Sequence, residues 1–245
     1  MRTKRSAKGW TFLALLAVSA GLASASAPTG RGMMYLDFGL HLNRMGEFQA
    51  YLDRSDMGYP TLARTYWTLG GGGLFIGRSL VVGLEGVCLL SRERAAGGHR
   101  SELGGAFGLL QIGYALINSD RLTLYPLLGA GGGAFTWHVQ SDVRPESFED
   151  AILFPEKGSS LLNASFILQA ALGADYWVRM KSGDRGTSCV VVGLRLGYTY
   201  SPFGDNWELL TADQALELKG GPELGITGPF IRLVVGWGGI GRNRR

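Results

Sequence analysis

This sequence of 245 residues has little cysteine, little histidine and no long hydrophobic run outside its N-terminus. Its two cysteines are too few for a disulfide-stapled scaffold. After residue 25, no apolar run approaches the roughly 20 residues of a transmembrane helix, which excludes a helical membrane protein. Its 39 glycines, by contrast, far exceed the ordinary frequency of about 7%.

The first 25 residues predict a signal peptide that is cleaved near Ala25. Basic residues crowd the first eight positions, an apolar stretch runs from Trp10 to about Leu22, and Ala23-Ser24-Ala25 is an A-x-A cleavage site. A membrane anchor is the alternative, but the apolar stretch is too short to span a bilayer comfortably. No cysteine lies near the cleavage site, so a lipoprotein anchor is not expected.

The basic character of the chain belongs to this signal. The whole sequence has 24 basic and 20 acidic residues, and the first 25 residues contain four basic and no acidic ones. The mature chain therefore has 20 of each and is close to neutral. Its charge gives no reason to expect nucleic acid as a partner.

Apolar and polar residues alternate with a period of two, which predicts β-strands. Between Leu162 and Val178 every even position is apolar, whereas the odd positions include Asn163, Gln169 and Asp175. Similarly clean stretches are residues 34–42, 80–90, 190–200 and 230–239. Three further strands are expected at about 65–76, 102–117 and 122–139, where glycine obscures their facing. Most of these strands are long enough to cross a bilayer when tilted.

The links between these strands alternate in length. The short links are residues 77–79, 118–121 and 180–188, and the long ones are about 43–64, 92–101, 140–160 and 201–227. This pattern predicts an all-β fold: a closed up-and-down antiparallel transmembrane β-barrel of eight strands, with short helices in its long outer loops. Aromatic residues are expected in girdles at both rims. The outer girdle would hold Trp67, Trp137, Tyr198 and Tyr200, and the inner girdle Tyr114, Tyr176 and Trp237.

A soluble barrel of the lipocalin type is the alternative, and it would turn its apolar residues inward. In the clean strands the second face is instead composed of glycine and of small or charged side chains. An eight-stranded barrel has room inside only for side chains, so glycines there would leave space for longer charged residues. This pattern favours the membrane barrel, with leucine, valine and phenylalanine toward lipid and small or ionic residues inside.

Two glycine-rich stretches resemble nucleotide-binding loops. Gly72 to Ser79 approaches a phosphate-binding loop but has arginine in place of lysine, and Gly129 to Ala134 approaches a dinucleotide fingerprint. Both motifs require a helix to begin directly after the loop, so that its N–H groups converge on phosphate. Each stretch is followed by a strand-like sequence instead. We therefore expect neither nucleotide nor any other cofactor.

At the level of topology and patterning, the chain resembles the small eight-stranded outer-membrane barrels, of the kind seen in OmpX and the membrane domain of OmpA. The stretch "YPLLGAGGGAF", residues 125–135, looks like the proline- and glycine-rich strand of such barrels. The resemblance implies an outer-membrane location, a monomer, and outer-membrane lipid and the barrel-assembly machinery as partners. The chain divides into signal peptide 1–25, linker 26–32, barrel 33–241 and basic tail 242–245. Many such proteins end on an aromatic residue, whereas this one continues past Trp237.

Charged residues on the interior face are the first candidate site. By parity, the side chains expected in the lumen are Asp37, Glu85, Asp175, Arg195 and Arg232. Charges held away from water need partners, so we expect a structural salt-bridge network that fills the bore. A gated path for ions is the functional alternative.

His138 is the second candidate, because lipid A deacylases use a histidine and a serine near the outer rim of a barrel. Ser141 lies one position too far along for their His-x-Ser spacing, so a water-exposed rim histidine is the simpler interpretation. Catalytic and metal sites are therefore not expected. Cys88 and Cys189 are expected to be too far apart for a disulfide and to remain free thiols.

The outer loops are predicted to form helices at about 207–218, from Pro145 onward, and over Met45 to Leu52, where Met45, Phe48 and Leu52 share one face. These helices would bind a surface ligand or cover the barrel. The sequence thus predicts an outer-membrane barrel with a structural or surface-interaction role. The alternatives are a narrow pore and a lipid A-modifying enzyme of the outer leaflet.

Overall fold

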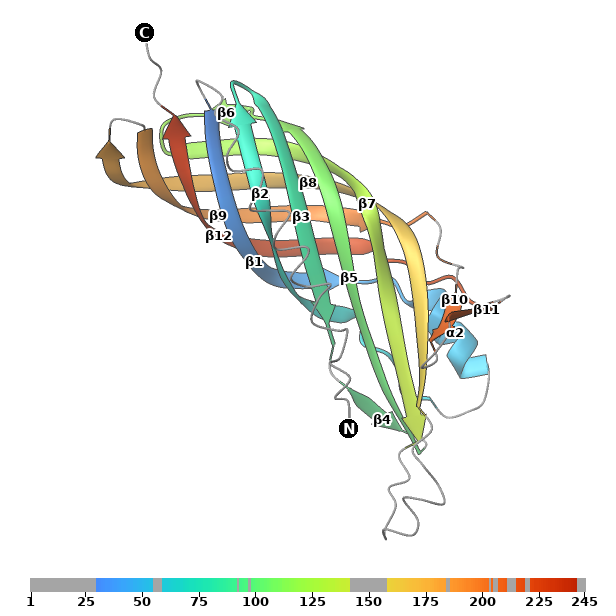
Figure 1. Ribbon diagram of the computed structural model, residues 1–245. Coiled ribbons are helices and arrows are strands. Elements are labelled where there is room, and N and C mark those ends of the chain that lie inside the picture. The colour runs from blue at the N-terminus through green and yellow to red at the C-terminus, as the bar shows by residue number, and fades with distance from the viewer. Residues whose placement is uncertain are drawn as a thin grey trace, which may run out of the picture.

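The structure is a computed structural model, and it describes residues 30–54, 59–91, 93–96, 98–141, 158–183, 186–202, 204, 207–210, 215–218 and 221–241. Eight long strands form a closed antiparallel barrel, in which each strand pairs with the next and the last pairs with the first (Figure 1). They are β1 (Gly30–Leu42), β2 (Thr65–Gly77), β3 (Leu80–Leu90), β5 (His99–Tyr114), β7 (Leu122–Ser141), β8 (Gly158–Gly183), β9 (Gly186–Tyr200) and β12 (Gly228–Gly241). The predicted fold class is confirmed.

Several expectations fall outside these residues: the signal peptide, the basic tail 242–245 and the helix from Pro145. The barrel begins at Gly30, three residues before its expected start at Met33. Among the described residues no helix is long and apolar enough to cross a membrane.

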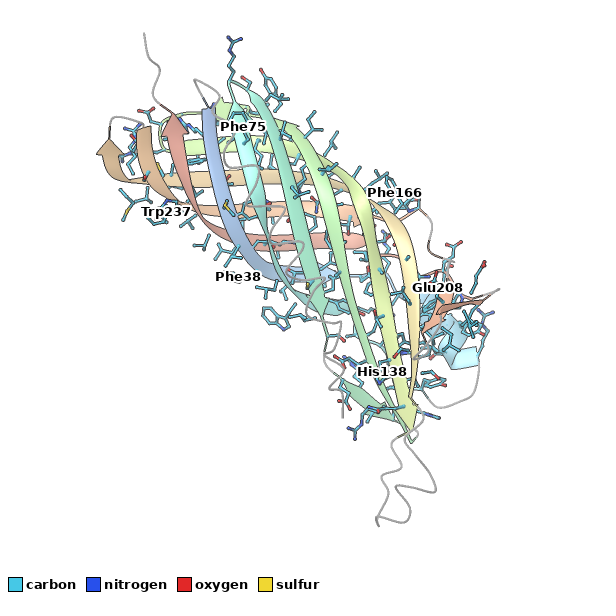
Figure 2. All side chains as sticks on the ribbon, in the orientation of Figure 1. Phe38, Phe75, His138, Phe166, Glu208 and Trp237 are labelled. Atoms are coloured by element: carbon cyan, nitrogen blue, oxygen red, sulfur yellow. The ribbon has the colours of Figure 1, made fainter. Side chains whose placement is uncertain are left out.

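The outer wall of the barrel is apolar, as the alternation predicted. Leu36 on β1, Leu110 on β5 and Leu128 on β7 are exposed by 62%, 69% and 64%, and side chains project outward along the whole wall (Figure 2). Inward and outward side chains also alternate in β2, β5 and β7, whose facing glycine had obscured: odd positions face outward in β2, and even positions face outward in β5 and β7. A belt of exposed leucine and valine is stable in lipid and costly in water, so this wall faces a bilayer.

Aromatic side chains mark both edges of the apolar wall. Trp67 is exposed at the outer end of β2, and Trp237 is exposed near the inner end of β12. Trp137 was expected in the outer girdle, but that prediction is wrong. Its side chain is only 8% exposed and points into the barrel, where its Nε1–H donates to Ser101 Oγ at 2.8 Å. An odd position in β7 faces inward, and the glycines of this strand had hidden its phase.

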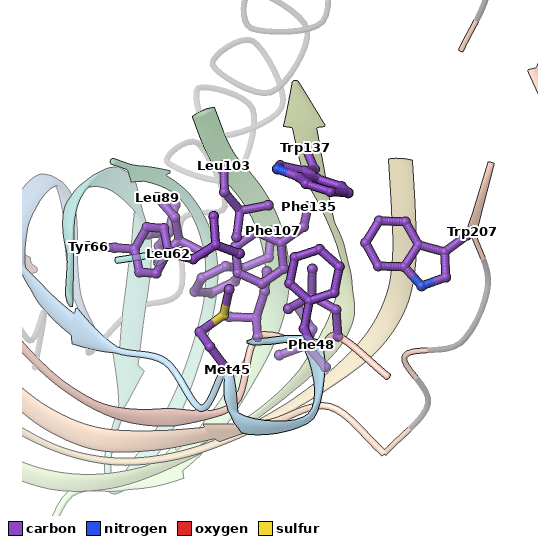
Figure 3. Packing of buried hydrophobic residues seen from close by; sticks show 14 of the residues in the cluster. Met45, Phe48, Leu62, Tyr66, Leu89, Leu103, Phe107, Phe135, Trp137 and Trp207 are labelled. Carbon is purple, nitrogen blue, oxygen red and sulfur yellow. The ribbon is translucent and has the colours of Figure 1, made fainter. Parts of the chain in front are cut away.

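The interior also differs from the expected lumen of small and ionic residues. Two clusters of large apolar side chains occupy it, one toward each end of the barrel. The outer cluster, shown in Figure 3, includes Phe48, Phe107, Phe135, Trp137 and Trp207. The inner cluster includes Leu74, Ile76, Tyr125, Leu127 and Trp177. Because eight strands enclose a space just wide enough for side chains, the bore is packed like a protein core.

Close approaches explain part of the glycine content. A Cβ on Gly70 would lie 2.9 Å from both carboxylate oxygens of Asp37, and a Cβ on Gly193 would collide with the side chain of Asp175. Glycine therefore makes room for buried carboxylates, as expected. After Gly77 and after Gly129 the chain continues as strand, so no helix N-terminus is present for a phosphate group.

The barrel wall is much higher on one side than on the other, and we call the outer part of β5, β7 and β8 on this side the high wall. Toward the outer end, β5, β7 and β8 continue past the other strands, and short strands extend the sheet beside them (Figure 1). These are β4 (Arg94–Ala96), which pairs with β5, and the hairpin of β10 (Trp207–Leu210) and β11 (Ala215–Leu218), in which β10 pairs with β8. The two-residue strand β6 (Ile117–Asn118) pairs with β7 near the inner end.

The hairpin replaces the helix predicted at 207–218, and that prediction is wrong. The pairing of β9 with β8 begins only at Leu168, which leaves the outer part of β8 without a partner from β9. Residues 207–210 pair with residues 160–163 and complete the backbone hydrogen bonds of this part of β8. Trp207 also buries its indole there, at 3% exposure. Tertiary pairing thus overrides a local helical pattern.

The helix predicted at 45–52 is present as α2 (Gly46–Arg54). Phe48 and Leu52 lie on its buried face, as predicted, and Met45, directly before the helix, packs in the same cluster; their exposures are 2%, 4% and 2%. The helix lies over the outer mouth, where the Phe48 ring packs edge-on against Trp137, with ring centroids 5.1 Å apart. On its other side Phe48 stacks on Trp207 at 5.4 Å. The helix therefore covers the outer mouth of the barrel and packs against the inner face of the high wall (Figure 3).

Candidate functional site

The five predicted lumen charges all point inward and lie between the two apolar clusters. Their side chains are essentially inaccessible: Asp37, Asp175 and Arg232 are 0% exposed, and Glu85 and Arg195 are 1% exposed. They come from β1, β8, β12, β3 and β9 in that order. We call these five residues the charged layer.

Glu85 is the centre of the charged layer. Arg232 Nη1 donates a hydrogen bond to Glu85 Oε1, and Arg195 Nη1 lies 3.7 Å from the same oxygen. Asp37 is more remote, because its Oδ1 atom is 3.9 Å from Arg232 Nε. Asp175 joins the layer through a tyrosine: the Tyr125 hydroxyl donates to Asp175 Oδ2 at 2.5 Å.

Polar and aromatic residues that the sequence did not single out complete this layer. Gln111 Nε2 donates to Glu85 Oε2 and, at 2.9 Å, to Gln169 Oε1. Arg195 donates to the Tyr35 hydroxyl at 2.6 Å and lies over its ring at 4.0 Å. Gln169 was visible as a polar residue at an interior position of a clean strand. Gln111 was not, because glycine obscured the facing of its strand.

The charged layer is not fully paired. Neither carboxylate oxygen of Asp37 accepts a hydrogen bond from a described residue, and Nε and Nη2 of both Arg195 and Arg232 have no acceptor among them. Three carboxylates face two guanidinium groups, so the formal charge of the layer is −1 when all five are ionised. Removing an arginine leaves the layer with more unpaired negative charge, whereas removing a carboxylate brings its formal charge to zero.

Apolar layers enclose the charged layer on both sides. Toward the outside, Phe107, Phe135 and Ile167 are buried beneath the α2 helix, and toward the inside lie Leu127 and Trp177. These side chains are 0–4% exposed. Within the described residues, the polar interior is thus separated from both mouths by tightly packed apolar side chains, which is unfavourable for ion passage.

The three histidines have separate environments. His41 is buried in the lumen, where Nε2 lies 2.7 Å from Thr199 Oγ1, and His99 packs against the Tyr59 ring, with centroids 4.8 Å apart.

Both cysteines are free, as predicted: Cys88 is half-buried on the lipid-facing side and Cys189 is buried inside. Among the described residues, no group of histidine, cysteine, aspartate and glutamate is arranged to hold a metal ion.

The high wall rises above the outer aromatic girdle. Tyr200, at the outer end of β9, pairs with Leu168 on β8, and β8 continues outward from there to Ser160. At about 3.4 Å per residue these eight steps cover roughly 27 Å along the strand. With a strand tilt of about 40°, that is roughly 20 Å along the membrane normal. Ser160 therefore lies outside the hydrocarbon layer, on the side of the long loops.

The third histidine, His138, has a serine partner on the outer face of this wall. His138 Nδ1 lies 2.8 Å from Ser160 Oγ, and both residues are partly buried. They are directly opposite each other in the β7–β8 ladder, and Glu102 is directly opposite His138 in the β5–β7 ladder. Ser141, the serine that the sequence suggested, instead pairs through its backbone with His99.

Sequence reasoning missed Ser160 because the pair is formed by strand register. The two residues are 22 positions apart, across a loop whose length gives no indication of pairing. Only the alternation of β8 carried a signal, because glycine obscured the facing of β7. Both residues occupy even positions, which face outward in these strands.

These features define a small eight-stranded β-barrel of the outer-membrane type, with an apolar lipid-facing wall, a filled interior and a wall that extends on the side of the long loops. No family model matches the chain, and no curated protein matches it. Among solved structures it is similar to Ail, the attachment invasion locus protein of Yersinia pestis, with a TM-score of 0.42, 9% identity, and coverage of 87% of this chain and 99% of that one. It is also similar to the outer membrane protease OmpT from Escherichia coli, with a TM-score of 0.35, 8% identity, and coverage of 90% and 100%. At these identities and TM-scores the likeness concerns the fold alone.

Proposed function

We propose that this protein is a non-conducting outer-membrane barrel that works at the cell surface, where the sheet of its high wall binds an extended segment of a partner protein. The observation that carries the proposal is the open edge of that sheet. Beyond the closed barrel, β4, β5, β7, β8, β10 and β11 follow one another in a single ladder, and in the described residues the ladder ends at β11.

The β11 edge has the chemistry of a strand-binding surface. A strand at the end of a sheet presents backbone N–H and C=O groups that a second chain can pair with. Soluble proteins protect such edges with several charges or with proline, whereas β11 has one exposed charged residue, Glu217, between Leu216 and Leu218, which are exposed by 48% and 38%. An edge strand above the membrane with two exposed leucines on one face favours a protein partner over a free edge.

The filled interior supports an anchoring role and disfavours the pore alternative. Water and ions would have to pass the apolar outer cluster, the charged layer and the apolar inner cluster in turn. Hydrophobic constrictions close channels by excluding water. The charged layer then serves to hold strands together through Glu85, Arg195 and Arg232 rather than to conduct. We propose that the protein is a monomer in the outer membrane, because its lipid-facing wall is apolar around the whole circumference.

An assay of cell attachment tests whether the β11 edge binds a partner protein. Cells that display the protein would be compared with cells that display Leu216→Lys/Leu218→Lys, in assays of attachment to protein-coated wells and to intact cell monolayers. Attachment should require the leucine pair, because Leu216 and Leu218 lie on the same face of β11 and supply its apolar contacts to an added strand. Glu217→Lys is the matched control, since it adds positive charge to the same strand and keeps both leucines.

Equal attachment by wild type and the double-lysine variant would refute the proposed edge. Folding of each variant is checked by the mobility of unheated and boiled samples in gel electrophoresis. Conductance in planar bilayers tests the other half of the proposal: stable unitary currents from the folded wild-type protein would show that the bore is not closed.

A further inference from the structure

We infer a hydrolytic site on the outer face of the high wall, with Ser160 as nucleophile and His138 as its base. The two side chains are already in hydrogen-bond contact, with Nδ1 and Oγ 2.8 Å apart. That contact is the basic requirement for serine activation, because the hydroxyl is a weak nucleophile until a neighbouring base takes its proton. None of its three residues belongs to the proposed strand-binding edge, β11.

A carboxylate lies on the other side of the histidine. Glu102, His138 and Ser160 occupy one row across β5, β7 and β8, and their outward parity puts all three side chains on the same face. Directly opposite residues have Cβ atoms about 4.5–5.5 Å apart, within reach of a glutamate side chain. We assign Glu102 as the positioning residue that orients the imidazole and stabilises its protonated form.

The site is open to substrate and rigidly supported. Glu102 is exposed, and His138 and Ser160 are partly buried. Ser160 and His138 stand on strands that are paired on both sides, since β8 lies between β7 and β10 and β7 lies between β5 and β8, whereas Glu102 is held through the pairing of β5 with β7. On the inner face of the same wall, Trp137 and Trp207 pack against Phe48 of α2. The hairpin β10–β11 thus completes the support for Ser160.

The reaction that fits this row is hydrolysis of an ester. Ser160 Oγ attacks the acyl carbon while its proton passes to His138 Nδ1. The bond from the acyl carbon to the alcohol oxygen then breaks, and His138 returns the proton to the departing alcohol. Water next attacks the acyl-serine, His138 takes the water proton, and Ser160 recovers it as the carboxylic acid leaves. Water is the only co-reactant.

The distance of the site above the membrane indicates which class of ester it can reach. Ser160 lies roughly 20 Å above Leu168, which pairs with the rim residue Tyr200, so the acyl esters of membrane lipids lie well below it. The neighbouring rows are largely polar, with Arg100 and Gln140 in the next row outward and Thr136, Leu162 and Glu208 in the next row inward. We therefore assign a short acyl ester on a surface saccharide, such as an O-acetyl group.

A fluorophosphonate probe and two ester sources test this assignment on the folded full-length protein in detergent. Wild type should be labelled by the probe and should release acetate from an O-acetylated polysaccharide. Ser160→Ala should abolish labelling and lower acetate release to the buffer rate, and His138→Gln should lower release by about 10²-fold or more. Ser159→Ala is the control, because the adjacent serine lies on the opposite face.

Glu102 has its own readout. Glu102→Gln should lower kcat about tenfold with little change in KM, and Glu102→Asp should restore part of the loss, as expected of a residue that orients the base. Equal acetate release and equal labelling in wild type and Ser160→Ala would overturn the site. Release of fatty acid from phospholipid vesicles or lipopolysaccharide, in place of acetate, would overturn the substrate assignment.

Discussion

Removing Arg232 should destabilise the barrel strongly, whereas neutralising Asp37 should not. Arg232 is 0% exposed and donates to Glu85, which is itself 1% exposed. Arg232→Met leaves three buried carboxylates with a single guanidinium group, and the nearest nitrogen of that remaining arginine, Arg195, is 3.7 Å from Glu85. Breaking a buried pair by removing one partner costs about 3–5 kcal/mol.

Asp37→Asn acts in the opposite electrostatic direction. Neither Asp37 oxygen accepts a hydrogen bond from a described residue, and its nearest cationic atom, Arg232 Nε, is 3.9 Å away. Asparagine has nearly the same shape, and it changes the formal charge of the layer from −1 to zero. We expect a change of less than about 1 kcal/mol, or a gain in stability, because an incompletely paired buried charge is removed.

Urea unfolding of the refolded barrel in lipid vesicles, followed by tryptophan fluorescence, measures both changes. Arg179→Met is the matched control, since Arg179 pairs with Asp120 at 2.9 Å but both side chains are largely exposed. That substitution should cost no more than about 1 kcal/mol. A loss for Asp37→Asn as large as that for Arg232→Met would refute our reading of the charged layer as a network that is short of positive charge.

Three further predictions follow from the wall and the outer cluster. In single-tryptophan variants, brominated lipids should quench Trp67, which faces lipid, and should leave Trp137 unquenched inside the barrel. Leu194→Arg places a charge on the lipid face and should cost about 2–4 kcal/mol in the same unfolding assay. Phe48→Ala removes a ring that packs between Trp137 and Trp207 and should cost about 3–5 kcal/mol, while bilayer conductance should remain absent because the inner cluster stays intact.

Sequence periodicity was sufficient to predict the barrel because strand facing depends on a local rule. Alternate residues point to opposite sides of a strand, so Leu162 to Val178 revealed the lipid-facing side without knowledge of any partner strand. The same rule placed Asp37 and Arg232 in the lumen, where the structure locates them. It failed for Trp137, whose strand is too rich in glycine to show a phase.

Features that depend on register or on tertiary pairing could not be predicted in this way. The helical pattern at 207–218 was genuine locally, but residues 207–210 form a strand because the outer part of β8 extends beyond β9. The contact between His138 and Ser160 depends on how β7 and β8 align across a long loop. The apolar filling of the bore was missed because alternation separates two faces and does not show that both contain large apolar residues.

The unequal height of the wall connects the surface features of this protein. A barrel that served only to cross the membrane would end near its aromatic girdle, as β1, β2 and β12 do close to Trp67. Strands β5, β7 and β8 continue well beyond that level, and a continuation exposed to water on both sides would lose most of its apolar contacts. Helix α2 supplies those contacts on the inner face, through Phe48. The outer face and the β11 edge are left accessible, and these are the two surfaces to which we assign function. Substitutions that detach α2 should therefore weaken both the Ser160 site and the β11 edge, although Phe48 touches neither Ser160 nor Leu216.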